Sequence, residues 1–142
     1  MAVDITRILD AVYGEALNKG NLQALDDVFE ADYVDHGPFG DLTGLDAFKQ
    51  MLTQWRQAFP DLHVTYSDVV QDGDRAAWRS RMTGTQLGDL PGIPATGQPM
   101  QLDTIDMGSA RGDRAVEHWS AMDRLSMLEQ LGVIPAPAVT GT

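Results

Sequence analysis

The spacing of apolar residues predicts three helices in the first part of the chain. Apolar side chains recur every three or four positions over residues 4–19, 22–29 and 46–59, which is the period of a helix with one buried face. A Lys-Gly-Asn sequence follows the first segment and Pro60 ends the last, as helix stops do. Residues 32–44, DYVDHGPFGDLTG, have the Gly, Pro and Asp content of a loop.

After Pro60 the period changes to two, which predicts strands. The turn sequences QDGD and RGD interrupt the alternation and are typical of hairpins. We therefore expect four antiparallel strands, at residues 62–70, 75–86, 100–110 and 114–123. A short final helix follows at residues 125–131, where Gly132 ends it.

This order of elements indicates one α+β domain. Helices that precede strands are typical of folds in which the helices lie on one face of an antiparallel sheet. We expect a cone-shaped fold in which N-terminal helices pack on a curved, mainly antiparallel four-stranded sheet and enclose an apolar pocket. The chain has 142 residues, the length of a single domain. Residues 136–142 are expected to form a flexible tail.

Composition narrows the classes of partner. The formal net charge of −11 argues against nucleic acids and anionic membranes, which need clustered basic residues. The chain has no cysteine, so thiolate catalysis and cysteine-ligated zinc are excluded. The three histidines lack a metal-ligand spacing, and we expect no metal. Without an apolar stretch near the N-terminus we expect a cytoplasmic protein.

Three stretches carry a resemblance to a known family: AFPDL at 58–62, GIPATG at 92–97 and EHWSAMDRLSMLEQLGVIP at 117–135. With the order of elements, they resemble the SnoaL-like polyketide cyclases of the nuclear-transport-factor-like and ketosteroid-isomerase-like superfamily. The resemblance implies a cone with an apolar pocket, commonly a homodimer, and an intramolecular aldol closure without a cofactor. It also implies that Asp123 is the general acid/base, and it places Asp106 where a histidine assists in the best-known cyclases.

The residues themselves also suggest a role for Asp123. If the RGD turn pairs Arg111 with Arg114, Asp106 lies opposite Trp119 and Leu102 lies opposite Asp123. Leu102, Thr104, Asp106, Trp119, Ala121 and Asp123 then share one face. An acid among apolar side chains has a raised pKa, as proton transfer to and from carbon requires. The alternative is that Asp123 caps the final helix, a role worth about 1 kcal/mol.

Two further polar residues are candidates for the site, and a third, His118, is expected to lie outside it. Asp106 lies about 13 Å along the strand from the position facing Asp123, so it is either a second polar anchor or a surface acid. His36 follows Asp35 and either shuttles a proton at the pocket mouth or fixes the local backbone. His118 alternates away from Trp119 and is expected to be structural, unless a β-bulge reverses its direction.

Aromatic and methionine side chains are candidates for the pocket wall. Trp55, Trp78 and Met82 can bind a flat apolar ligand or pack in an ordinary core. Thr104 and Trp119 lie on the predicted pocket face. Tyr13 either donates a hydrogen bond to an oxyanion or buries its ring. The Gly- and Pro-rich segment 88–99 is either a lid or a rigid loop.

The leading hypothesis is a cofactor-independent acid/base enzyme that acts on a small hydrophobic carbonyl substrate, of the polyketide cyclase type. One alternative is a non-catalytic module that binds small molecules or dimerises through the same fold. Another is an epoxide hydrolase of the limonene epoxide hydrolase type, which needs an arginine between two acids. The relevant strand has Gln101 before Asp103 and lacks that arginine.

Overall fold

The structure is a computed structural model that describes residues 3–135, and the predicted tail at 136–142 lies outside them. Its helical segments are α1 (Ile5–Leu9), which continues as the π-helix η1 (Asp10–Leu17), the single 3₁₀ turn η2 (Leu22–Leu25), α2 (Leu45–Ala58) and α3 (Arg124–Gln130). The predicted first, third and final helices are confirmed. The second is shorter than predicted because Phe29 already begins a strand. Among the described residues, no helix has the length and apolar character needed to cross a membrane.

The sheet has six strands, whereas the sequence pattern predicted four. They are β1 (Phe29–Gly37), β2 (Gly40–Thr43), β3 (His63–Asp72), β4 (Arg75–Thr85), β5 (Pro99–Arg111) and β6 (Arg114–Met122), in the spatial order β2-β1-β6-β5-β4-β3. All pairs are antiparallel except β1 with β6. The segment predicted as a loop, residues 32–44, is therefore mostly the β1–β2 hairpin. Its partner β6 lies far away in the sequence, so local composition gave no sign of the pairing.

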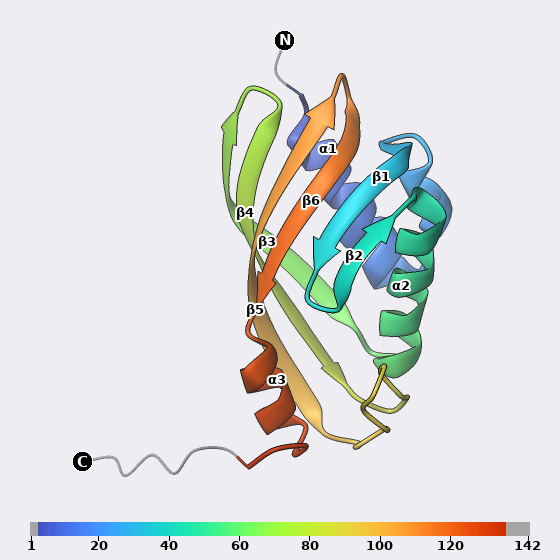
Figure 1. Cartoon of the computed structure of the whole chain (residues 1–142), viewed down its shortest axis with the longest axis vertical. Helices are drawn as coiled ribbons and strands as arrows, with labels where there is room; N and C mark the ends of the chain where they lie inside the picture. Colours follow the sequence, from blue (N-terminus) through green and yellow to red (C-terminus); the bar gives the residue numbers. More distant parts are fainter. Residues whose placement is uncertain (1–2, 136–142) are drawn as a thin grey trace, which may run out of the picture.

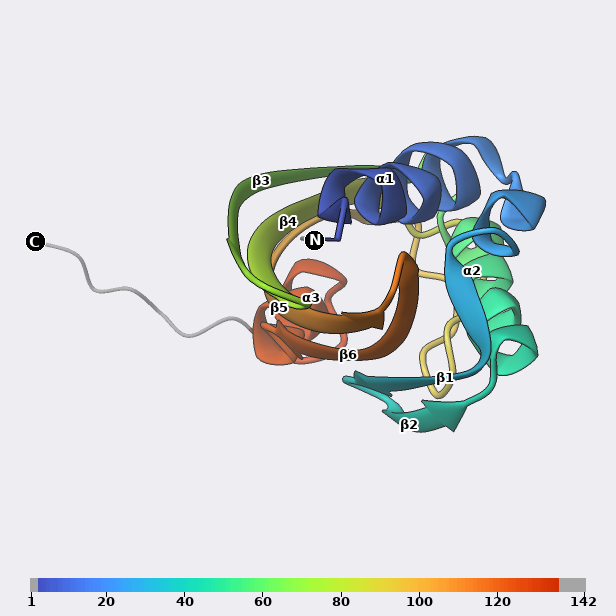
Figure 2. The ribbon, with the colours of Figure 1, turned by 90° about the horizontal axis from the view of Figure 1, so that it is seen from above.

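The sheet curves around an interior that the helices close (Figures 1 and 2). Viewed from above, the strands wrap round the interior, α1 crosses the open side and α2 lies next to β1. Burial along β5 alternates at almost every position, because successive side chains of a strand point to opposite faces. Leu102, Thr104 and Asp106 face the interior, whereas Ile105 and Met107 are exposed on the outer face.

The register between β5 and β6 differs from the predicted one by one residue. Arg111 pairs with Arg114 as predicted, but a bulge between Ser109 and Ala110 shifts every later pair. Asp106 therefore lies opposite Ser120, and Trp119 lies opposite Met107 on the outer face. The prediction that Asp106 faces Trp119 was wrong. A one-residue slip turns each side chain to the other face, so His118 points inward.

The Gly- and Pro-rich segment 88–99 is tied to the domain. The side chain of Gln86 is fully buried; its Nε2 donates to the Ile93 carbonyl at 3.2 Å and its Oε1 accepts from Thr96 Oγ1 at 2.7 Å. Leu90 and Ile93 are buried and exchange two backbone hydrogen bonds of 2.9 Å. These contacts favour the rigid loop over the lid.

Candidate active site

A cavity of about 110 Å³ lies between the helices and the inner face of the sheet. Its walls are mainly apolar, with residues from α1, η1, α2 and all of the strands except β2. Representative wall residues are Leu9, Val12, Phe48, Trp55, Trp78 and Met82. A mainly apolar cavity with a few polar groups at one wall is the usual form of a small-molecule site.

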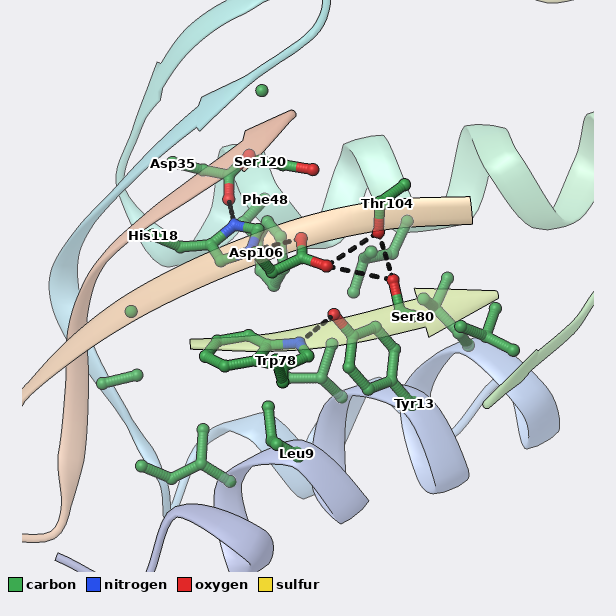
Figure 3. Close-up of a pocket in the computed structure, with 18 of the residues that line it drawn as sticks. Leu9, Tyr13, Asp35, Phe48, Trp78, Ser80, Thr104, Asp106, His118 and Ser120 are labelled. Atoms are coloured by element: carbon green, nitrogen blue, oxygen red, sulfur yellow. Dashed lines mark hydrogen bonds and ion pairs between the residues drawn. The ribbon is translucent and has the colours of Figure 1, made fainter. Parts of the chain in front are cut away.

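The polar wall of this cavity is a chain of three ionisable side chains from adjacent strands (Figure 3). His118 on β6 contacts Asp35 Oδ1 through Nδ1 at 2.6 Å and Asp106 Oδ1 through Nε2 at 3.0 Å. Asp35 on β1 is the register partner of His118, and Asp106 on β5 lies two residues from its other partner, Gly108. The carboxylate side chains are only 3% exposed and the imidazole is 18% exposed.

Neutral side chains donate further hydrogen bonds to the carboxylate groups of Asp35 and Asp106. Ser80 and Thr104 donate to Asp106 Oδ2 at 3.0 and 2.7 Å. Tyr33 donates to Asp35 Oδ1 at 2.8 Å. From the residues that the structure describes, Asp35 Oδ2 accepts no hydrogen bond, and Asp35 lines the cavity. A carboxylate oxygen of this cluster is therefore available to a bound molecule.

Opposing effects set the protonation of the cluster. Burial alone lowers the pKa of His118, but the hydrogen bonds to Asp106 and Asp35 outweigh it and raise this pKa to about 9. Burial raises the pKa of Asp106, yet the contacts with His118, Thr104 and Ser80 bring it below its ordinary value. At neutral pH, His118 is therefore an imidazolium that donates from both nitrogens, and Asp106 is a carboxylate.

Tyr13, on η1, points its hydroxyl toward this cluster (Figure 3). Trp78 Nε1 donates to Tyr13 Oη at 3.0 Å, so the phenolic hydrogen is left for another acceptor. Burial raises the pKa of Tyr13, and the group stays a neutral donor. Trp78 also stacks on His118, with ring centroids 5.7 Å apart. Gly108 leaves room for this stack, because a Cβ there would lie 3.1 Å from the indole ring.

Six of the predicted site residues line the cavity: Tyr13, Trp55, Trp78, Met82, Thr104 and Asp106. The structure thus brings the predicted apolar wall together with one predicted acid. Their roles in binding or catalysis stay predictions.

The other three predicted residues lie elsewhere. Asp123 is exposed and caps α3, where its Oδ1 accepts from the Ser126 backbone N–H at 2.9 Å. His36 contacts Glu117 at 2.6 Å and Asp41 at 2.9 Å, and its ring stacks on Trp119. None of Asp123, His36 and Trp119 lines the cavity. The capping alternative for Asp123 is confirmed, and its expected position on the pocket face was wrong because β6 ends at Met122.

Sequence reasoning missed Asp35 and Ser80, and it placed His118 on the wrong face. Asp35 lay in the segment interpreted as a loop, and Ser80 was passed over between two arginines. The alternation of Tyr33 and Asp35 could have signalled an inward strand face, since both are 2% exposed. The bulge alone determines whether the His118 side chain points inward or outward, and the sequence analysis left a bulge open as an alternative.

Comparison with known proteins agrees with this architecture. The family model described as SnoaL-like polyketide cyclase matches residues 7–131. TsrD from Streptomyces laurentii is 28% identical with a TM-score of 0.84, covering 92% of this chain and 96% of TsrD. IdmH from Streptomyces antibioticus, a candidate polyketide cyclase, is 31% identical with a TM-score of 0.77, and the match covers 91% of this chain and 99% of IdmH.

A third structure, the candidate hydroxylase AclR from Streptomyces galilaeus, shares the fold at 24% identity and a TM-score of 0.79, covering 95% of this chain and 84% of AclR. A search of curated proteins gives no significant match. The family model covers most of the chain, and the structural similarity to TsrD supports the same fold. The chain belongs to the SnoaL-like polyketide cyclase family.

Proposed function

We propose that this protein is a cofactor-independent acid/base enzyme that closes a ring in an apolar polycarbonyl compound by intramolecular aldol condensation. The observation that carries the proposal is the Asp35–His118–Asp106 chain, which lies against an apolar cavity and has one carboxylate oxygen free. The proton carrier in this proposal is Asp35, supported by Asp106 and His118, and no longer Asp123.

The first step is removal of a proton from carbon. Asp35 Oδ2 takes a proton from a carbon between two carbonyl groups, which leaves an enolate on the substrate. A carboxylate is a weak base, so the carbon must be acidified on both sides, as in a 1,3-dicarbonyl. Two carboxylates and one imidazolium give the cluster a net charge of −1, and proton uptake neutralises it. His118 holds Asp35 and Asp106 close together despite their like charges.

The second step forms the ring. The enolate carbon attacks a second carbonyl carbon of the same molecule, and a C–C bond replaces the C=O π bond. The new alkoxide takes back the proton that Asp35 received. The Tyr13 hydroxyl, oriented by Trp78, donates to the developing oxyanion. Proton and electrons balance within the substrate, so the reaction needs no oxidant, reductant or second reactant.

The epoxide hydrolase alternative fits this site less well. It requires an arginine between two acids, and the cavity lining, as far as the structure describes it, contains no arginine. A histidine stands between the two acids here.

The test uses a methyl β-ketoester with a second ketone in the same chain, and it follows ring closure by NMR. We expect Asp35→Asn to reduce kcat by about 10²- to 10⁴-fold, the usual contribution of a positioned acid/base. Asp123→Asn is the matched control, because Asn caps a helix as well as Asp does, and we expect it to keep the wild-type rate. Equal losses in both variants, or no loss in Asp35→Asn, would refute the assignment. Ligand binding without turnover by the wild type would favour the binding module.

A further inference from the structure

A second pocket, of about 180 Å³, lies beside the main cavity. We call it the outer pocket. It is lined by Phe39, Gly40, Leu42, Ala47, Gln50, Met51, Gln54, Trp55, Leu90 and Pro91, which come from the β1–β2 hairpin, from α2 and from the 88–99 segment. The function proposed above gives this pocket no role.

The two pockets share a wall. Met51 and Trp55, one turn apart on α2, line both of them. Trp55 is held by ring contacts with Phe59 and Phe39, at centroid distances of 5.7 and 5.9 Å. Met51 is only half-buried, and a methionine side chain has three rotatable bonds with which it adapts to its surroundings. The shared wall therefore consists of one fixed ring, Trp55, and one adaptable side chain, Met51.

The far wall of the outer pocket is fixed. Leu90 is buried and is bonded to Ile93, and Gln86 holds the segment that carries them. The loop that the sequence left open as lid or rigid loop thus supplies a permanent side to this pocket. A preformed wall lowers the ordering cost of binding.

The polar groups of the outer pocket are neutral. Gln50 and Gln54 lie one turn apart on the same face of α2, and both line the outer pocket while remaining exposed to solvent. The lining has no charged side chain. Each amide can both donate and accept, so the pair suits a hydroxyl, ketone or amide group. The remaining wall, with Phe39, Leu42 and Leu90, suits a hydrocarbon chain.

The small volume of the main cavity supports such an extension. At about 110 Å³ it is smaller than the roughly 150 Å³ that holds one benzene ring. A chain long enough to close on itself therefore extends beyond it. We propose that the outer pocket binds the distal end of the same substrate, and that this end is an apolar chain with a neutral polar group. This inference rests on the proposed function.

The experiment compares two β-diketones of equal size by titration calorimetry. One carries a heptyl tail, and the other carries a tail of the same number of non-hydrogen atoms that ends in a primary amide. We expect the double variant Gln50→Leu/Gln54→Leu to shift the ratio of their Kd values about tenfold in favour of the heptyl compound, the worth of one to two hydrogen bonds. Gln57→Leu is the control on the same helix, because Gln57 lines neither pocket, and it should keep the wild-type ratio.

A ratio unaltered by the double variant would overturn the outer pocket as a subsite. So would binding of acetylacetone, which has no tail, with no binding of either tailed compound; the proposed function would then survive. If no β-diketone binds at all, the proposed function fails and the inference fails with it.

Discussion

Two histidines of this protein have the same kind of partners and different surroundings. His118 lies between Asp35 and Asp106, at 2.6 and 3.0 Å. His36 lies between Glu117 and Asp41, at 2.6 and 2.9 Å. The carboxylates around His118 are 3% exposed, whereas those around His36 are 38% and 71% exposed. The clusters occupy neighbouring positions of the β1–β6 pair, since Asp35 pairs with His118 and His36 with Trp119.

The distances between a histidine and its carboxylate partners therefore do not by themselves indicate the role of the cluster. Water screens the contacts of His36 and replaces them at little cost when they break. In the His118 cluster each charge has lost its hydration, so each depends on the others. This dependence supports the buried cluster as the proposed proton carrier, whereas the carboxylates of the His36 cluster are exposed.

The largest expected difference between the clusters is in stability. We expect His118→Leu to lower the free energy of unfolding by about 3–5 kcal/mol, because it leaves two buried carboxylates without a cation. His36→Leu should cost a small fraction of that value. Urea unfolding of both variants checks this, and similar losses in the two would break the comparison.

A smaller effect is expected from pH. The pKa of His118 is raised to about 9, above the unfolded value of about 6.5. Protonation then stabilises the fold fully below about pH 6.5, and this stabilisation is lost as the pH rises through about 9. The loss is on the order of 3 kcal/mol. Urea midpoints measured across this range should fall in the wild type and in His36→Leu but stay nearly level in His118→Leu. A level wild-type profile would contradict the raised pKa.

The smallest effect concerns Asp123, an acid outside both clusters. We expect Asp123→Ala to lower stability by about 1 kcal/mol through loss of the N-cap, and Asp123→Asn to change it little. Thermal unfolding of the two variants distinguishes the cap from a role in the cavity. A larger loss in Asp123→Asn than in Asp123→Ala would argue against the cap.

Local sequence patterns were sufficient to predict much of the fold. The apolar period of α2 and the alternation in β3 to β6 depend on neighbours in the sequence, and the elements formed where the pattern placed them. The cavity wall followed, because Trp78, Met82 and Thr104 lie on faces that the alternation defines.

The Asp35–His118–Asp106 cluster depends on structural features that the local sequence pattern does not indicate. The bulge at Ser109 and Ala110 turns His118 inward and Trp119 outward, and the parallel partner β1 was interpreted as a loop. Asp123 follows the last strand and precedes the last helix. An acid at this position is expected both for a general acid/base of the cavity and for a helix N-cap. Only the tertiary contacts distinguish these two roles of Asp123.

The parallel β1–β6 pair also determines when the site comes into being. Asp35 and His118 are 83 residues apart, and β6 leaves the ribosome after every other strand. Closing so long a loop is entropically costly and slow compared with forming the hairpins. The β5–β6 hairpin brings His118 to Asp106 over only 12 residues, but until β6 docks on β1, Asp35 has no contact with this pair. A chain that has not yet paired β1 with β6 therefore lacks the Asp35–His118 contact, and the three-residue cluster is complete only after this pairing.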